Sequence, residues 1–176
     1  MYKRQKFNDI AALSPQEAIS KYQIKESPHW GFIEAKLQMS SDIENHVKPV
    51  LFRPFDIRYI YYEKCMIERG DHRFELMSHM LEENLSLIAV RRSETADASQ
   101  HFYSSNHISV LHSTSSKEGN FVFPLYTYPN TKNEQGSLFV EKSPNFSSDF
   151  IAAIREKLGY TPNPEAIFYY IYAIFY

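Results

Sequence analysis

Apolar residues recur at helical spacing in the first part of this chain, and aromatic and β-branched residues become dense after it. Residues 14–17, Ser-Pro-Gln-Glu, form a capping box with proline at the first helical position, which predicts a short helix over residues 15–22. Apolar positions predict a second helix near residues 30–40. Pro49 ends this helical region, and a sheet is predicted to begin near Val50.

Strands and helices are predicted to follow one another beyond this point. A loop at residues 67–72 leads into a helix that reaches about Leu81. Residues 85–90 have the composition of a buried strand. Further strands are predicted at residues 102–103, 108–110 and 121–128.

The last part of the chain is predicted to be helical. Ser147 or Ser148 caps one helix, and Gly159 closes it. Residues 163–165, Asn-Pro-Glu, open the last helix. This order of elements predicts an α+β fold with a mixed, mostly antiparallel sheet flanked by helices.

Residues 51–62 combine a high aromatic content with charge. Arg53, Asp56 and Arg58 lie among large apolar and aromatic side chains. Buried charges are costly unless they are paired, so this segment does more than fill a core. One interpretation is an internal ion pair between Asp56 and the arginines. The other is contact with a phosphate, a base edge or the carboxylate of a partner.

The composition fits one folded domain without a surplus of basic residues. The chain has 176 residues, of which 43% are hydrophobic and 15% aromatic, which is enough for a core. Its net charge of −2 differs from the basic balance of autonomous DNA-binding domains. The single cysteine, Cys65, excludes an internal disulfide and fits a reducing cytoplasm. Neither a signal peptide nor an apolar membrane span is found, so no membrane partner is expected.

No set of residues for catalysis or metal binding emerges from the sequence. The five glycines never form a Gly-x-Gly turn for a cofactor, and a Walker-type phosphate loop is absent. His72 and His79 lie about two helical turns apart, and His101, His107 and His112 lack the spacing of a zinc motif. We therefore expect this chain to hold neither catalytic residues nor a metal site.

Residues 53–58, Arg-Pro-Phe-Asp-Ile-Arg, followed by an aromatic run, resemble the block that opens the target-recognition region of single-chain restriction–modification enzymes. These are the type ISP enzymes and their single-polypeptide type II relatives. Later blocks occur in the order found in that family. They are Arg69 and Arg73, Phe74–Leu81, Asn84–Leu87 leading to Arg91 and Arg92, Phe123–Tyr126, Asn145–Phe146 and Pro164–Ala173. The resemblance covers residues 47–176, and residues 1–46 match it more loosely.

The resemblance implies a DNA sequence-recognition fragment without a cofactor or catalytic step of its own. In such enzymes, a separate domain methylates adenine at N6 with S-adenosylmethionine, and a nuclease domain cuts unmodified DNA. Residues 163–165 lack the second proline and the aromatic residue of the Asn-Pro-Pro-aromatic motif of such methyltransferases. The expected partners are therefore double-stranded DNA and the methyltransferase and nuclease domains of a cytoplasmic parent enzyme.

The expected domains are an N-terminal helical segment over residues 1–46 and a recognition core over residues 47–176. The chain stops within the hydrophobic run Ile171–Tyr176, whereas natural termini are usually polar. We therefore expect a piece of a longer polypeptide that is truncated at its C-terminus.

The predicted DNA contacts are arginines and the polar residues around them. Arginine reads guanine bidentately and also clamps phosphates. Arg91 and Arg92 follow the predicted buried strand and open a polar loop, and the loop at residues 113–117 is either a second reader or a linker. The predicted DNA-binding set is Arg53, Arg58, Tyr61, Lys64, Arg69, His72, Arg73, Arg91, Arg92 and Ser93.

The alternative function is a protein-interaction or scaffolding module. Such a module would pack against the catalytic domains of the parent enzyme through the truncated C-terminal helix and a surface rich in tyrosine and phenylalanine, of which the chain has 13 each. The nearly neutral net charge favours this alternative.

Overall fold

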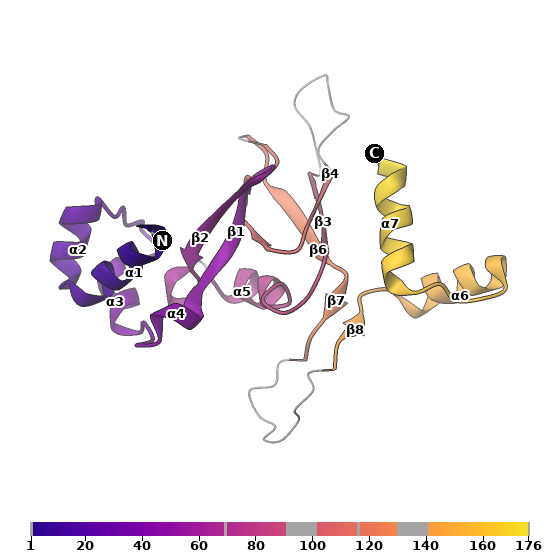
Figure 1. The fold of residues 1–176 in the computed structure, drawn as a ribbon, viewed down its shortest axis with the longest axis horizontal. Coiled ribbons are helices and arrows are strands. Elements are labelled where there is room, and N and C mark those ends of the chain that lie inside the picture. The colour runs from indigo at the N-terminus through magenta and orange to yellow at the C-terminus, as the bar shows by residue number, and fades with distance from the viewer. Residues whose placement is uncertain (1, 69, 91–101, 116, 130–140, 176) are drawn as a thin grey trace. The chain divides into compact units, whose positions relative to one another are not determined.

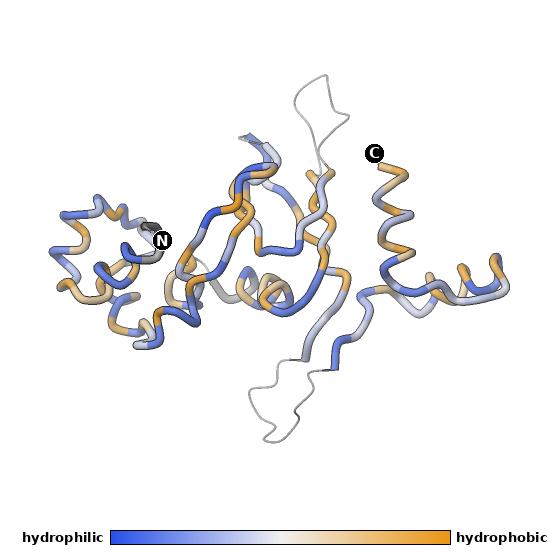
Figure 2. The backbone as a smooth tube through the Cα atoms, viewed as in Figure 1, coloured by the Kyte–Doolittle hydropathy of each residue, from blue (hydrophilic) through white to orange (hydrophobic). Residues whose placement is uncertain are grey.

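The structure, a computed structural model, describes residues 2–68, 70–90, 102–115, 117–129 and 141–175. Within these residues, helices and short, mostly antiparallel strands make up the predicted α+β fold (Figure 1). Hydrophobic and hydrophilic residues alternate along most of the elements (Figure 2).

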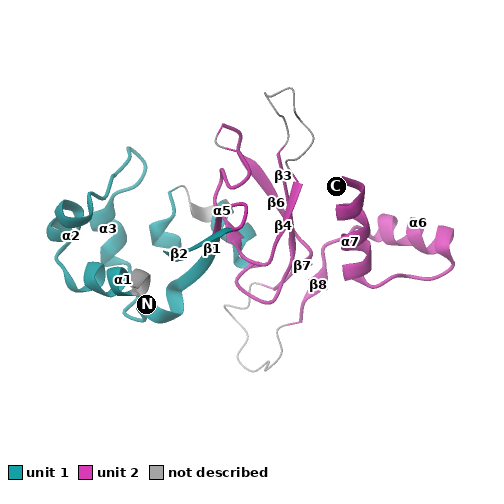
Figure 3. Ribbon diagram, turned by 45° about the horizontal axis from the view of Figure 1, so that its top comes forward, with its two compact units in different colours: residues 1–50, 56–78 teal, residues 51–55, 79–176 magenta. Residues whose placement is uncertain are grey.

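The contacts within the chain divide it into two compact units (Figure 3). Unit 1 comprises residues 1–50 and 56–78, and unit 2 comprises residues 51–55 and 79–176. The domain boundary expected between residues 46 and 47 stays a prediction.

Unit 1 is mainly helical in its described part. Its elements are α1 (Tyr2–Ala12), α2 (Pro15–Tyr22), α3 (Phe32–Leu37), α4 (Ile43–His46), the first part of β1 (Val47–Arg53), β2 (Asp56–Tyr61), the 3-10 helix η1 (Lys64–Met66) and α5 (Gly70–Ser78). The predicted helices near residues 15–22 and 30–40 are α2 and α3. The helix that was predicted to reach about Leu81 ends at Ser78.

The capping box predicted for α2 is present in full. The amide of Glu17 donates to Ser14 Oγ (3.3 Å), and the amide of Ser14 donates to Glu17 Oε2 (3.0 Å). Gln23 follows the helix with a φ of 51° and closes it. The first amides of a helix lack partners within the helix, so this reciprocal pair fixes where α2 begins.

The strand β1 begins at Val47, earlier than the predicted Val50, and contains Pro49. Proline holds φ near −65°, which ends a helix but is compatible with extended backbone. Pro49 therefore stops the helical region without delaying the strand. β1 and β2 are neighbours in a sheet.

The sequence pattern does not predict α1, because a contact distant in sequence supports this helix. Lys36 Nζ donates to the carbonyl oxygens of Ile10 (2.6 Å) and Leu13 at the C-terminal end of α1. A cation is favourable there because the end of a helix carries partial negative charge. Burial lowers the pKa of Lys36, against the opposing effect of Glu17.

Unit 2 contains most of the sheet structure. Its elements are the end of β1 (Leu51–Arg53), β3 (Ser86–Val90), β4 (Phe102–Ser105), β5 (Ile108–Ser109), β6 (Asn120–Pro124), β7 (Tyr126–Thr127), β8 (Ser143–Pro144), α6 (Ser148–Leu158) and α7 (Pro164–Phe175). β3 pairs antiparallel with β4 on one side and with β6 on the other. The strand predicted over residues 85–90 is thus the central strand of a three-stranded sheet.

The two faces of this sheet differ in burial. Ile88 on β3 and Val122 on β6 are opposite each other and buried. On the other face, Leu87 lies opposite Phe123, and Ala89 opposite Phe121. Phe121 and Phe123 remain about half exposed. The alternation follows the two-residue period of a strand.

A buried asparagine ties the start of β3 to β7. Asn84 Nδ2 donates to the carbonyls of His79 (2.9 Å) and Tyr126 (2.8 Å). Its Oδ1 accepts from the amides of Leu85 (2.9 Å) and Tyr126 (3.0 Å). Because the side chain of Asn84 is nearly inaccessible, these bonds replace the water that it would otherwise bind.

The two C-terminal helices begin where the sequence predicts. Ser147 Oγ accepts from the amide of Phe150 (3.2 Å), and Gly159 follows α6 with a φ of 77°. Asn163 Oδ1 accepts from the amide of Ala166 (2.7 Å) at the start of α7. The buried Phe168 of α7 belongs to the same apolar core as Leu125 and Tyr126.

Candidate nucleic-acid interface

Asp56 and Arg58 form an ion pair on β2 of unit 1. Arg58 Nη2 and Nε donate to Asp56 Oδ2 at 2.8 and 3.0 Å. The Asp56 side chain is 40% exposed and that of Arg58 is 48% exposed. The pair therefore lies at the surface, where solvent reaches both side chains.

Arg53 of unit 2 turns its guanidinium towards backbone carbonyls. Its Nη1 donates to the carbonyl of Phe52 (3.0 Å) and to that of His112. The guanidinium also lies over the Phe52 ring, 4.7 Å from the ring centroid. Arg53 thus ties the end of β1 to the loop between β5 and β6.

The loop between β5 and β6 is built on a buried hydroxyl and amide cluster. Ser113 is fully buried, and its amide (2.9 Å) and hydroxyl (3.1 Å) both donate to Asn120 Oδ1. Ser109 Oγ donates to Ser113 Oγ (2.8 Å). Ser113 therefore holds the loop in shape, while Lys117 of the same loop is exposed.

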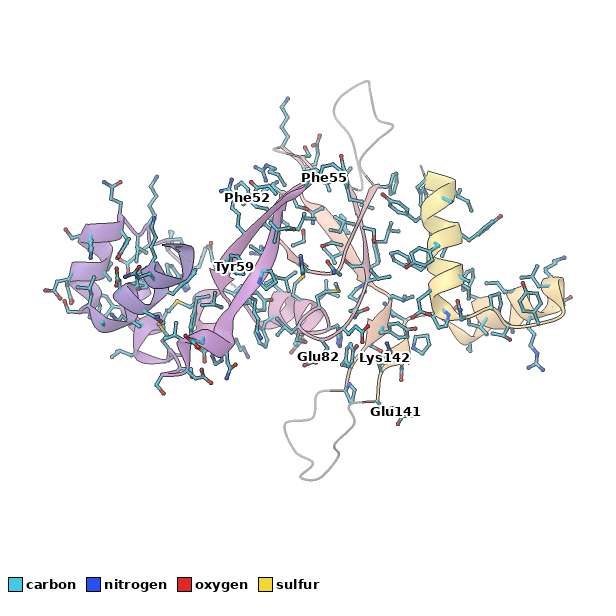
Figure 4. The ribbon with its side chains drawn as sticks, in the orientation of Figure 1. Phe52, Phe55, Tyr59, Glu82, Glu141 and Lys142 are labelled. Atoms are coloured by element: carbon cyan, nitrogen blue, oxygen red, sulfur yellow. The ribbon has the colours of Figure 1, made fainter. Side chains whose placement is uncertain are left out.

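Phe55 lies in the turn that follows β1, next to Pro54. Its φ is 64°, in the left-handed region, and its side chain is 99% exposed. Figure 4 shows the ring at the tip of the turn. The sequence shows that this segment is rich in aromatic residues but does not distinguish Phe55 from the others. A residue pattern gives neither the exposure of a side chain nor its backbone φ.

Tyr61, a predicted DNA contact, takes part in a polar cluster of unit 1. Its hydroxyl donates to Glu63 Oε2 (2.5 Å), and its ring stacks on His46 at 5.5 Å between centroids. The amide of Ser40 donates to the same oxygen (3.0 Å), and His46 Nε2 lies 3.9 Å from Glu63 Oε1. The sequence does not reveal this cluster, because its members are spread along the chain.

The polar cluster shifts the acidity of two of its members. Burial pushes the pKa of Glu63 upwards, but the hydrogen bonds from Tyr61 and Ser40 and the nearby His46 outweigh it and hold this pKa below its usual value. Burial and the contact with Glu63 raise the pKa of Tyr61. The hydroxyl of Tyr61 therefore stays protonated and donates to Glu63.

The remaining predicted contacts differ in how far the structure describes them. Lys64 in η1 and Arg73 in α5 are exposed. Arg73 Nη1 lies 3.4 Å from the carbonyl oxygen of Glu68. Residues outside the described part of the chain are Arg69, Arg91, Arg92 and Ser93, together with the side chain of His72. Their assignment to DNA stays a prediction.

A second polar group, in unit 2, was not foreseen from the sequence. Tyr126 Oη donates to Glu165 Oε1 (2.5 Å), and Lys142 Nζ lies 4.3 Å from the Tyr126 ring centroid. These residues line a cavity of about 360 Å³ together with Asn106 and Tyr169. Burial and the bond to Glu165 raise the pKa of Tyr126 to about 12. The same bond is the main reason why the pKa of Glu165 is lowered.

Among the described residues, no group of three or more His, Cys, Asp or Glu side chains is arranged to hold a metal ion. No helix in the described ranges is both long and apolar enough to cross a membrane.

The family comparison covers nearly the whole chain. The sequence model for the Type ISP C-terminal specificity domain matches residues 4–176. The match therefore extends beyond the expected residues 47–176 and includes the N-terminal helices. No curated protein matches the chain.

Two solved structures resemble the fold. The first is described as "cryoEM structure DrdV-DNA complex", with a TM-score of 0.60, 21% identity and coverage of 99% of this chain and 16% of the other. The second is described as "ATP-dependent Type ISP restriction-modification enzyme LlaBIII bound to DNA", with a TM-score of 0.63, 18% identity and coverage of 97% and 11%. The chain thus spans 16% and 11% of the length of these two proteins.

Proposed function

The chain belongs to the Type ISP C-terminal specificity domain family, and we propose that it recognises a DNA target sequence for a larger restriction–modification enzyme. The observation that carries this proposal is the family match over residues 4–176. The two similar structures support it, because both were determined with DNA. In this role, phosphate contacts set the register of the domain on DNA, and contacts to base edges select the sequence.

The exposed basic side chains of unit 1 are the proposed phosphate contacts. Arg58 on β2, Lys64 in η1 and Arg73 in α5 are accessible to solvent. Asp56 already holds the Arg58 guanidinium through Nε and Nη2, so the contact proposed for Arg58 is a charge contact with a phosphate and not a bidentate one. The net charge of −2 confines the attraction for DNA to such local positions.

The proposed base readers are Arg91 and Arg92. They follow directly after β3, which is bonded on both sides by β4 and β6 and is the most firmly held strand of its sheet. Such a strand is a rigid base for a reading side chain. Replacing a base-reading arginine by alanine in the complete enzyme should relax the sequence preference at one position of the DNA site. Removing a phosphate-binding side chain should instead weaken the binding to all DNA sequences alike.

A binding titration tests the proposal. The chain should bind a fluorescent duplex of roughly 20 base pairs at low salt, and weaken to a Kd at or above roughly 10⁻⁶ M at physiological salt. Changing Arg58, Lys64 and Arg73 together to alanine should lower the salt slope by about one for each phosphate that is no longer neutralised.

The matched control changes Lys6, Lys21 and Lys25 to alanine. These exposed lysines of unit 1 carry the same total charge but are not proposed contacts. Equal effects of the two triple variants would mean that net charge alone governs binding. Absence of binding at low salt would refute the proposed function.

The chemistry of the parent enzyme is proposed to lie in other domains. A methyltransferase domain would methylate adenine at N6 with S-adenosylmethionine, and a nuclease domain would cut unmodified DNA. This chain lacks a Gly-x-Gly turn for that cofactor. Calorimetry of the chain with S-adenosylmethionine should therefore give no heat of binding, and micromolar affinity would contradict this assignment.

A second candidate function, a protein-interaction module, is favoured by the outer face of α7. Tyr170 and Ile174 lie one turn apart on the same face of this helix and are 70% and 64% exposed. Such an apolar stripe is typical of a surface that another protein covers. Changing Tyr170 and Ile174 to serine should leave DNA binding intact if this face serves only protein contacts.

A further inference from the structure

An aromatic residue occupies a backbone position that favours glycine in the turn after β1. Proline followed by a residue with positive φ is the pattern of a type II turn, whose second central residue is usually glycine or asparagine. Here Pro54 is followed by Phe55 with a φ of 64°. A bulky side chain strains this conformation, and such strain is concentrated at functional sites.

Burial does not compensate for the strain at Phe55. Its side chain is 99% exposed, more than any other large hydrophobic residue described as exposed in the chain. A phenylalanine that is both strained and exposed breaks two local rules at once. In natural proteins, such violations indicate a functional residue.

The support of Phe55 is firm. Arg53 donates to the carbonyls of Phe52 and His112 and lies over the Phe52 ring. The amide of Val110 donates to the carbonyl of Leu51 (3.2 Å). All of these residues belong to unit 2. The ring is therefore held out into solvent by a turn that is anchored at its base.

The loop that anchors the turn carries an exposed lysine. Lys117 is exposed on it, and its amide lies near the hydroxyl of Ser115 (3.2 Å). The carboxylate of Glu118, next to Lys117, accepts from Ser115 Oγ within the loop. The exposed ammonium of Lys117 suits the backbone of a nucleic acid better than an apolar protein surface.

We propose that Phe55 is an apolar wedge that inserts between stacked base pairs of DNA, while Arg53 fixes the turn and Lys117 contacts the phosphate backbone. The proposal rests on the proposed function and adds a way of reading DNA, through how readily a base step unstacks. An inserted aromatic ring separates neighbouring bases and makes binding depend on the deformability of the step.

A comparison of two duplexes tests the wedge. Both have the same sequence and roughly 20 base pairs, and one lacks a single base in its centre. Because the missing base removes part of the unstacking cost, the unaltered chain should bind the abasic duplex about tenfold more tightly at low salt. Phe55→Ala should reduce this ratio to about one, and Phe55→Trp should retain it.

The control is Phe121→Ala, which removes a half-exposed phenylalanine from unit 2 and should leave the ratio unchanged. If Phe55→Ala keeps the full ratio, or if the unaltered chain shows no preference while binding both duplexes, the wedge is refuted and a protein contact becomes the explanation for the exposed ring. If the unaltered chain binds neither duplex, the proposed function fails together with the wedge.

Discussion

At the scale of single residues, Phe55 shows how function and stability can be separated. A left-handed conformation costs a residue other than glycine about 1–2 kcal/mol. Replacing such a residue by glycine relieves this cost. Glycine has a greater chain entropy in the unfolded state, however, and this offsets about 0.5–1 kcal/mol of the relief. Phe55 therefore holds a conformation that glycine would hold at lower free energy.

We expect Phe55→Gly to raise the free energy of unfolding by up to about 1 kcal/mol. The strain is relieved, and no buried packing is removed because the ring is exposed. Urea denaturation should show an increase for this variant and a decrease for Phe121→Gly, which introduces glycine into the interior of β6. If Phe55→Gly lowered the free energy of unfolding as much as Phe121→Gly, the backbone at Phe55 would not be strained.

The ion pair of Asp56 and Arg58 should contribute little to stability. Exposed pairs typically contribute about 0.2–1 kcal/mol, against about 3–5 kcal/mol for removing one partner of a buried pair. Since both side chains are at least 40% exposed, Asp56→Ala should cost less than about 1 kcal/mol. A thermal melt in which the free energy of unfolding falls by several kcal/mol would show that the ion pair is buried in the folded protein.

At the scale of elements, helix starts were predictable and distant supports were not. Ser14, Ser147 and Asn163 cap helices through bonds that reach only three residues along the chain, so a local pattern reveals them. Lys36 supports α1 from 26 residues away, and Asn84 bonds to Tyr126 over 42 residues. Such contacts depend on tertiary structure, which the spacing of residue types does not encode.

Asn84→Ala should be among the more destabilising single changes in unit 2. It leaves the amide and carbonyl of Tyr126 without their partners in a buried place, and each unsatisfied group costs about 1–3 kcal/mol. The exposed Asn106 offers a matched control, since Asn106→Ala should change the stability by less than about 0.5 kcal/mol. Equal urea midpoints for the two variants would contradict the role of Asn84.

The bond between Tyr126 and Glu165 should make the stability depend on pH at both ends. The lowered pKa of Glu165 gives stability that is present above the usual value of 4.5 and is lost as the pH falls through the lowered pKa. The raised pKa of Tyr126 gives stability that is full below pH 10 and is lost as the pH rises from 10 to about 12.

Tyr126→Phe should therefore flatten both arms of the pH profile and cost about 1 kcal/mol at neutral pH. Tyr160→Phe, at a side chain that is 62% exposed, is the control and should leave the profile unchanged. Urea denaturation across the pH range measures both. A profile for Tyr126→Phe that parallels the unaltered chain would mean that the bond does not form in solution.

At the scale of the whole molecule, the α+β fold was predictable, whereas the interface was predictable only in part. The order of blocks after residue 53 indicated the family, and the comparison extended the match to residue 4. Arg53 and Arg58 were both considered as partners of Asp56. In the structure, Arg58 pairs with it, whereas Arg53 bonds to backbone carbonyls. The choice between such partners depends on strand geometry, which the sequence does not reveal.

The central claim is that this chain reads a DNA sequence, and selection from a random pool tests it most directly. The chain is mixed at low salt with duplexes that contain a randomised centre, and the bound fraction is recovered, amplified and sequenced over several rounds. The account predicts that one short sequence becomes enriched, and that the Arg58, Lys64 and Arg73 triple variant recovers less DNA with the same preference. A bound fraction that stays as random as the starting pool would contradict the account.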